Sequence, residues 1–181
     1  KGVADDTIRR HSQRYHHRVK EKAMKRRILV LLVENNPGVL TRITLLFGQR
    51  GFNIASLTVS PTCLKETSRI TIVTYADKEL ITQVIKQTSK LVEVQSVELL
   101  DEDNAIEKDL LLLKISTQKY DERKFCDISN IYNAKILDIS PKSLIVELCA
   151  APQVIESYLA ELKDFELLEL SRTGITAMQR G

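Results

Sequence analysis

The side chains best placed for chemistry lie in the polar loop Glu34–Gly38, which separates an apolar run from an amphipathic one. The amphipathic run predicts a helix that begins at this loop, and the first N–H groups of a helix lack backbone partners and attract anions. Gly38 has no Cβ, so a small ligand could approach the backbone closely. A carboxylate on the helix terminus, with an ammonium on nearby carbonyls, would make that ligand an α-amino acid.

The other residues of the loop fit two interpretations. Asn35 and Asn36 offer amide donors and acceptors to a ligand, but both are also residue types that cap helices. Pro37 fixes φ for a first helical turn. Asn53, which begins a neighbouring strand, adds a polar side chain in an apolar setting. Local chemistry therefore leaves a binding loop and an ordinary capped turn both open.

Enzymatic chemistry finds no support in the body of the chain. From Ile28 onward there is no histidine, which removes Ser-His-Asp and Cys-His catalysis and His-containing zinc sites from that region. Neither a Walker loop nor a GxGxxG motif is present. Cys63, Cys126 and Cys149 form no CxxC pair, so we expect reduced thiols that pack in or beside apolar elements. We therefore expect no catalytic residues, no metal site and no cofactor in this chain.

Charge is distributed unevenly along the chain. Residues 1–27 carry ten Lys or Arg and three acids, a charge of +7 that leaves −4 for the remainder. Residues 1–25 hold all three histidines and show no convincing apolar stripe. We expect them to form a flexible extension that is a leader remnant, a targeting segment or a cloning-derived addition. A basic arm that contacts nucleic acid or an acidic partner is the alternative.

Apolar periodicity predicts the elements that must position the loop. Ile28–Val33 is typical of a buried strand and is far shorter than the roughly 20 apolar residues of a membrane span, so we expect no membrane insertion. The following helix has five apolar residues at helical spacing: Val39, Leu40, Ile43, Leu46 and Phe47. Further strands are predicted over 52–60, 68–76 and 91–100, with a second helix after Asp77.

The same order of elements recurs after an acidic linker. Strands are predicted over 110–115, 134–139, 143–149 and 165–170, with helices over 120–132 and about 154–162. The fold class is therefore α+β, with two consecutive ferredoxin-like βαββαβ domains. The first spans 26–100, the linker 101–107 and the second domain 108–181.

Two apolar runs predict that the sheets need covering. Ile28–Val33 and Leu110–Leu113 lack the polar alternation that a solvated sheet face requires. Large exposed apolar patches are rare on monomers. We expect a second copy of the chain to cover these faces, and packing of the two halves against each other is the alternative.

Several strings of the sequence resemble a known family, the regulatory (small) subunits of acetohydroxyacid synthase, also called acetolactate synthase. The first half resembles their ACT domain. The matching strings are Glu34–Leu40, Phe47–Ile54, Ser56–Val59, Ser68-Arg69, Lys90–Val92, Leu111–Lys114 and Ser171–Gly174. Together they extend the resemblance over about residues 25–181.

The resemblance implies a regulatory subunit with no catalytic activity of its own. Such subunits bind a large catalytic subunit that carries thiamine diphosphate, a divalent metal such as Mg and FAD. They raise its activity and confer feedback inhibition, usually by valine. The resemblance also implies a homodimer through the ACT domains, with effector sites at their interface. The effector-binding positions matched by motif are Asn35, Asn36, Pro37, Gly38, Val39, Leu40, Asn53 and Ile54.

Two other functions remain as alternatives. A stand-alone ACT-type amino-acid sensor would act on a different partner. An RNA-binding module of this fold would need aromatic side chains on its central strands, where this chain offers only Tyr75, so we expect no nucleic-acid partner. The expected location is the cytoplasm, or the plastid stroma in a photosynthetic eukaryote.

Overall fold

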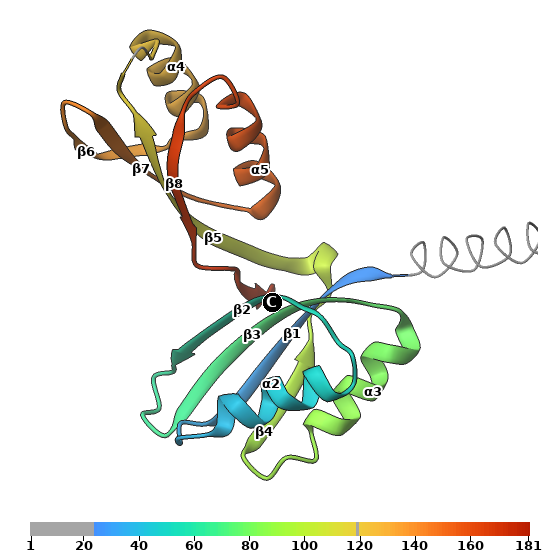
Figure 1. The fold of residues 1–181 in the computed structure, drawn as a ribbon. Coiled ribbons are helices and arrows are strands. Elements are labelled where there is room, and N and C mark those ends of the chain that lie inside the picture. The colour runs from blue at the N-terminus through green and yellow to red at the C-terminus, as the bar shows by residue number, and fades with distance from the viewer. Residues whose placement is uncertain (1–23, 119) are drawn as a thin grey trace, which may run out of the picture. The chain divides into compact units, whose positions relative to one another are not determined.

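A computed structural model of the chain describes residues 24–118 and 120–181. The expected extension over residues 1–25 lies almost wholly outside the described residues, and so do the three histidines. The described chain divides into two compact units, with the main division between Leu100 and Asp101 (Figure 1).

The first unit is a four-stranded antiparallel sheet with two helices. Its elements are β1 (Lys25–Glu34), α2 (Val39–Gln49), β2 (Ile54–Pro61), β3 (Thr67–Ala76), α3 (Lys78–Thr88) and β4 (Val94–Leu99). The strand order is β2-β3-β1-β4, and α2 and α3 lie together on one face of the sheet (Figure 1). This is the order of a ferredoxin-like βαββαβ unit.

The second unit repeats this plan and adds a strand. Its elements are η1 (Glu102–Asn104), β5 (Ala105–Ser116), α4 (Glu122–Tyr132), β6 (Lys135–Ile139), β7 (Ser143–Ala150), α5 (Pro152–Glu161), β8 (Leu167–Arg172) and β9 (Thr176–Gln179). The order β6-β7-β5-β8 matches the first sheet position by position, and β9 pairs with the start of β5. The predicted fold class, two consecutive βαββαβ units, is confirmed.

Some element boundaries differ from the predicted ones. β1 begins at Lys25 rather than Ile28, because its polar first residues continue the ladder with the end of β3. The segment 101–107 is not a free linker, since it holds η1 and the first residues of β5. β9 was not predicted, because Thr-Ala-Met-Gln carries little strand signal and its pairing with Ala105–Lys108 is set by the partner strand.

The junction between β8 and β9 is fixed by a buried carboxylate. Asp109 is 2% exposed, and its Oδ2 accepts from Arg172 Nε at 2.9 Å and Nη2 at 2.6 Å. Thr173 Oγ1 lies 3.2 Å from Asp109 Oδ1, and Arg172 also donates to Glu156. A buried charge is tolerated only when it is paired in this way, so the network holds the chain at the point where β5 changes partner.

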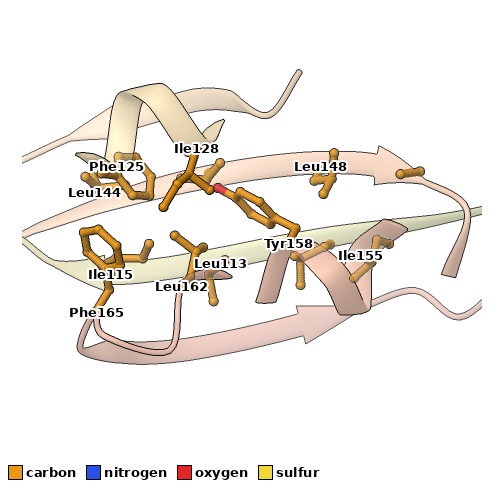
Figure 2. Packing of buried hydrophobic residues seen from close by; sticks show 13 residues of the cluster. Leu113, Ile115, Phe125, Ile128, Leu144, Leu148, Ile155, Tyr158, Leu162 and Phe165 are labelled. Atoms are coloured by element: carbon orange, nitrogen blue, oxygen red, sulfur yellow. The ribbon is translucent and has the colours of Figure 1, made fainter. Parts of the chain in front are cut away.

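Apolar side chains of β5, β7, α4 and α5 form the core of the second unit. Figure 2 shows Tyr158 of α5 among them, with its hydroxyl directed toward α4. That hydroxyl lies 3.1 Å from the Ser129 hydroxyl, and both residues are buried. Phe125 and Phe165 pack edge to face with ring centroids 5.7 Å apart. The core therefore contains one satisfied polar pair among apolar contacts.

The two apolar runs behave differently. Ile28 to Leu31 are all at most 2% exposed, so β1 is buried on both faces. In β5, Leu111 and Leu113 are buried, but Leu112 between them is 38% exposed. Within one chain, β5 therefore buries one face and leaves the other open, because alternate side chains of a strand face opposite sides. Covering of the open face by a second copy of the chain stays a prediction.

Two further observations concern groups on the surface. Cys63 and Cys149 are exposed and only Cys126 is partly buried, so the expected packing of the thiols is wrong for two of the three.

Among the described residues, no helix has the length and apolar character needed to cross a membrane.

The buried Tyr158 predicts a pH dependence of stability. Burial raises the pKa of its hydroxyl above the ordinary value of 10.0, although the Ser129 hydrogen bond opposes this shift. The unfolded chain therefore ionises first, so stability is retained below pH 10 and falls as the pH rises through the folded pKa. Tyr158→Phe should lower the free energy of unfolding by about 1 kcal/mol at neutral pH and flatten its decline above pH 10. Urea titrations at several pH values measure both effects, and Tyr75→Phe, at an exposed position, is the control.

Candidate functional site

The loop between β1 and α2, hereafter the 34–38 loop, is held by bonds to two other parts of the first unit. Glu34 N–H donates to the carbonyl of Glu93 at 2.9 Å, and Asn35 N–H donates to the carbonyl of Glu66 at 2.8 Å. Arg42 on α2 forms an ion pair with the Glu93 carboxylate. The loop is therefore anchored both to the segment before β4 and to the connection between β2 and β3.

The N-terminus of α2 has no side-chain cap. Its N-cap residue is Gly38, at φ +88° and ψ −13°, and no acidic residue lies in the first turn. The first bond back within the helix is from Arg42 N–H to the Gly38 carbonyl. The N–H groups of Leu40 and Thr41 come before that bond, so they have no partner within the helix.

The corresponding helix of the second unit begins differently. The N-cap of α4 is Asp121, and its carboxylate accepts from Lys124 N–H at 3.0 Å. Helix α3 is capped in the same way by Asp77, as predicted from sequence. A carboxylate supplied by the chain satisfies these two termini, whereas α2 has no such carboxylate. Helix α5, with Ala151 as its N-cap, also lacks a side-chain cap.

The predicted capping by the loop asparagines is wrong. The Asn36 amide donates to the Glu34 carboxylate at 2.9 Å, and the Asn35 amide donates to the Lys65 carbonyl at 3.1 Å. Pro37 lies in a turn before the helix rather than in its first turn. Gly38 has a left-handed backbone here. The Asn36 carbonyl accepts from Val39 N–H at 3.4 Å, but neither asparagine side chain caps the first turn.

The site is an open surface. Asn35, Asn36, Pro37 and Gly38 are all exposed, and a Cβ built on Gly38 would meet nothing within 4 Å. Of the apolar residues predicted for α2, Val39 is buried but Leu40 is 40% exposed, so its side chain is available to a ligand. A hollow lined by Arg50, Phe52, Gln83 and Gln87 lies at the other end of α2.

Asn53 and Ile54 lie at the opposite end of the sheet from the 34–38 loop. The Asn53 carbonyl accepts from Thr74 Oγ1 at 2.7 Å, and Thr74 pairs with Arg27 near the start of β1. The stretch from Arg27 to Glu34 spans about 23 Å of strand. Within one chain, the structure therefore brings Asn35–Leu40 together but leaves Asn53 and Ile54 far away.

The turn after α2 determines where Asn53 lies. Gly51, at φ +70°, donates to the Gly48 carbonyl, and Phe52 N–H donates to the Phe47 carbonyl. These two bonds form a Schellman motif, in which a left-handed glycine ends the helix. The rings of Phe47 and Phe52 then pack edge to face at 5.9 Å. Asn53 follows directly and so leads into β2.

Sequence reasoning missed the residues that support the loop. Glu66 and Glu93 bind it through their backbone carbonyls, and Ser68 binds Asn35 through its side chain. All three lie about thirty or more residues away along the chain, and although Ser68 belongs to a string that resembles the family, no local pattern connects any of them to the loop. The available signal was topological, because a β1–β3 pairing places the end of β1 beside the start of β3.

The groups exposed at this site are of the kinds that bind small anions. The site offers free N–H groups at a helix terminus, amide groups and an exposed leucine side chain. Among residues 24–118 and 120–181, no three His, Cys, Asp or Glu side chains gather as metal ligands would.

Two family models match the chain. Residues 29–96 match the AHAS small subunit-like ACT domain, where AHAS is acetohydroxyacid synthase, and residues 108–181 match the small subunit of acetolactate synthase.

Similar proteins cover most of the chain. It is 39% identical over 153 residues to the probable acetolactate synthase small subunit of Archaeoglobus fulgidus, covering 84% of this chain and 96% of that one. It is 36% identical over 157 residues to the isozyme 3 small subunit of Escherichia coli, covering 86% and 96%. The crystal structure of the acetolactate synthase small subunit from Thermotoga maritima matches with a TM-score of 0.82 and 34% identity, covering 87% and 98%.

The backbone at Gly38 predicts opposite effects of two alanine substitutions in one helix. Gly38→Ala places a Cβ in open space but on a left-handed backbone, so it should lower the free energy of unfolding by about 1–2 kcal/mol. Gly48→Ala, also in open space but inside α2, should raise it by about 0.5–1 kcal/mol. Chemical denaturation of both variants measures the difference, and equal effects would contradict the left-handed assignment.

Proposed function

Since the chain belongs to the family of acetolactate synthase small subunits, we propose that it regulates the catalytic subunit of that enzyme. It activates the catalytic subunit and makes it sensitive to feedback inhibition by a branched-chain amino acid, with valine as the first effector to test. The thiamine diphosphate, Mg and FAD of the reaction are held by the catalytic partner, and this chain supplies the effector site.

The uncapped N-terminus of α2 carries this proposal. The α-carboxylate of the effector accepts hydrogen bonds from Leu40 and Thr41 N–H and interacts favourably with the helix dipole. The absence of a Cβ at Gly38 lets it approach, and the exposed Leu40 side chain contacts the aliphatic side chain of the effector. The capped terminus of α4, at the matching place in the second unit, cannot accept the same anion because Asp121 already occupies it.

The separation of Asn53 from the 34–38 loop supports a site shared by two chains. β2 is an edge strand of the first sheet, so a second ACT domain can lie beside it. A two-fold axis at that edge reverses the second sheet, and the loop end of one sheet then faces the Asn53–Ile54 end of the other. Each complete site combines Asn35–Leu40 of one chain with Asn53 and Ile54 of its partner.

The effector site is tested by adding a carboxylate to the α2 terminus. Gly38→Asp provides an N-cap side chain that tolerates left-handed backbone and occupies the position of the effector carboxylate. We expect valine inhibition of the complex to be lost while activation of the catalytic subunit is retained. Acetolactate formation is measured with valine, leucine and isoleucine in turn.

Gly38→Asn is the matched control, since an asparagine side chain has the shape of aspartate without its charge. The Gly38→Asn complex should therefore lose less of its sensitivity to valine than the Gly38→Asp complex. A Gly38→Asp complex that remains fully valine-sensitive would refute this site. A chain that binds an amino acid but never alters acetolactate formation would instead be a stand-alone sensor with another partner.

The shared site predicts complementation between two defective chains. In a mixture of Gly38→Asp and Asn53→Leu chains, each mixed dimer contains one site with both halves intact. Random pairing then restores about one quarter of the sites, which calorimetric titration with valine detects. As the control, a chain carrying both substitutions is mixed with unsubstituted chain. Its mixed dimers contain no intact site, so about one quarter of all sites bind valine, all in unsubstituted dimers, whereas a site built within one chain would leave about one half. If mixing the single variants restores no binding, the two halves do not come from different chains.

A further inference from the structure

The side chain of Asn35 is already engaged away from the α2 terminus. Its Nδ2 donates to the Lys65 carbonyl at 3.1 Å, and its Oδ1 accepts from Ser68 Oγ at 3.0 Å. Because a backbone carbonyl can only accept, the atom facing Lys65 must be the amide nitrogen, and the oxygen therefore faces Ser68. Together with the backbone bond to Glu66, two hydrogen bonds therefore join Asn35 to the connection between β2 and β3, and a third joins it to Ser68 at the start of β3.

That connection is the β2–β3 hairpin, Thr62–Glu66, and hydrogen bonds across and within it hold its backbone. Thr62 N–H donates to the Thr67 carbonyl at 2.9 Å, and Thr67 N–H donates to the Leu64 carbonyl at 3.0 Å. Leu64 N–H donates to Thr62 Oγ1 at 3.1 Å. The hairpin is therefore an ordered segment whose backbone is held by its own hydrogen bonds.

The hairpin and its anchor differ sharply in exposure. Ser68 is 6% exposed, whereas Leu64 at the tip is 64% exposed and is followed by the exposed Lys65 and Glu66. Protein interfaces have an apolar centre and a polar rim, so Leu64 with its charged neighbours is open to a contact of that kind. The partly buried Ser68–Asn35 bond thus joins the effector loop to the start of β3, at the end of the sheet where the hairpin lies (Figure 1).

We propose that Asn35 is a positioning residue that transmits effector binding to the β2–β3 hairpin, through which the catalytic subunit senses it. This inference rests on the proposed function. Effector bound at the α2 terminus shifts Asn35, and the hydrogen bonds to Lys65, Glu66 and Ser68 carry that shift to the exposed Leu64. Such a link contributes to the inhibition of the catalytic subunit and adds little to the affinity for the effector, because the side chain of Ser68 bonds to Asn35 and not to the N–H groups of the α2 terminus.

The test separates binding from response in the complex with the catalytic subunit. Ser68→Ala removes one bond of the link and changes no residue of the 34–38 loop. We expect the Kd for valine, measured by calorimetry, to change by less than about threefold, while the extent of inhibition at saturating valine falls by more than about half. A purely structural role would not change the extent of inhibition at saturation.

A matched control removes a different bond to the base of the same hairpin. Gln95 Nε2 donates to Thr67 Oγ1 at 3.3 Å and does not touch Asn35, so Gln95→Leu should leave the inhibition of the complex unchanged. Full inhibition of the Ser68→Ala complex, or equal losses in Ser68→Ala and Gln95→Leu, would overturn the link. So would a loss of valine affinity in Ser68→Ala that accounts for its loss of inhibition.

Hydrogen exchange of the unsubstituted complex keeps the inference testable if Ser68→Ala does not fold. Saturating valine should change the exchange rates of the Leu64 and Thr67 amides, and no change there would refute the link. If the unsubstituted chain binds none of valine, leucine and isoleucine, the proposed function fails as well. If valine binding and inhibition are normal but the exchange rates of the Leu64 and Thr67 amides do not change, only the link is refuted and the proposed function stands.

Discussion

The antiparallel pairing of β1 with β3 is the constraint on which the first unit depends. Ten residue pairs, from Lys25 with Ala76 to Glu34 with Thr67, fix its register. A slip by one residue would reverse the faces to which all side chains of β1 point. The same register sets the end of β1 beside the start of β3, so it places Asn35 within hydrogen-bond reach of Ser68 and the β2–β3 hairpin. Core packing and site geometry thus follow from one ladder.

The two units show how one topology can carry different chemistry. Both have the same strand order, and both end their first helix with a residue in the left-handed region, Gly51 in one and Asn133 in the other. They differ where that helix begins, since Gly38 leaves its terminus open and Asp121 fills the other. A fold does not determine function, and here a single cap residue separates a candidate ligand site from a satisfied helix end.

Sequence periodicity was sufficient for the fold class because both copies show short apolar or β-branched runs typical of strands and apolar residues at helical spacing, in the same order. It failed at β9, whose four residues form a strand only because β5 offers them an edge. The position of the 34–38 loop between a strand and a helix was predicted correctly, whereas the capped-turn interpretation of its asparagines was not borne out. Helix caps are local and leave a signal, whereas the partners of Asn35 come from residues thirty or more positions away. The family motif grouped Asn53 with the 34–38 loop. In one chain the two lie at opposite ends of the sheet, because Asn53 follows α2 and leads into β2.

That separation has a consequence for how the chain would respond in a cell. If each effector site is completed by a partner chain, occupancy and association are thermodynamically linked. The apparent affinity for the effector then rises with the concentration of the chain itself, and the effector in turn strengthens the dimer. Sensitivity to end product would be weak while the regulator is scarce and would sharpen as it accumulates. The level of expression would thus act as a second control on feedback.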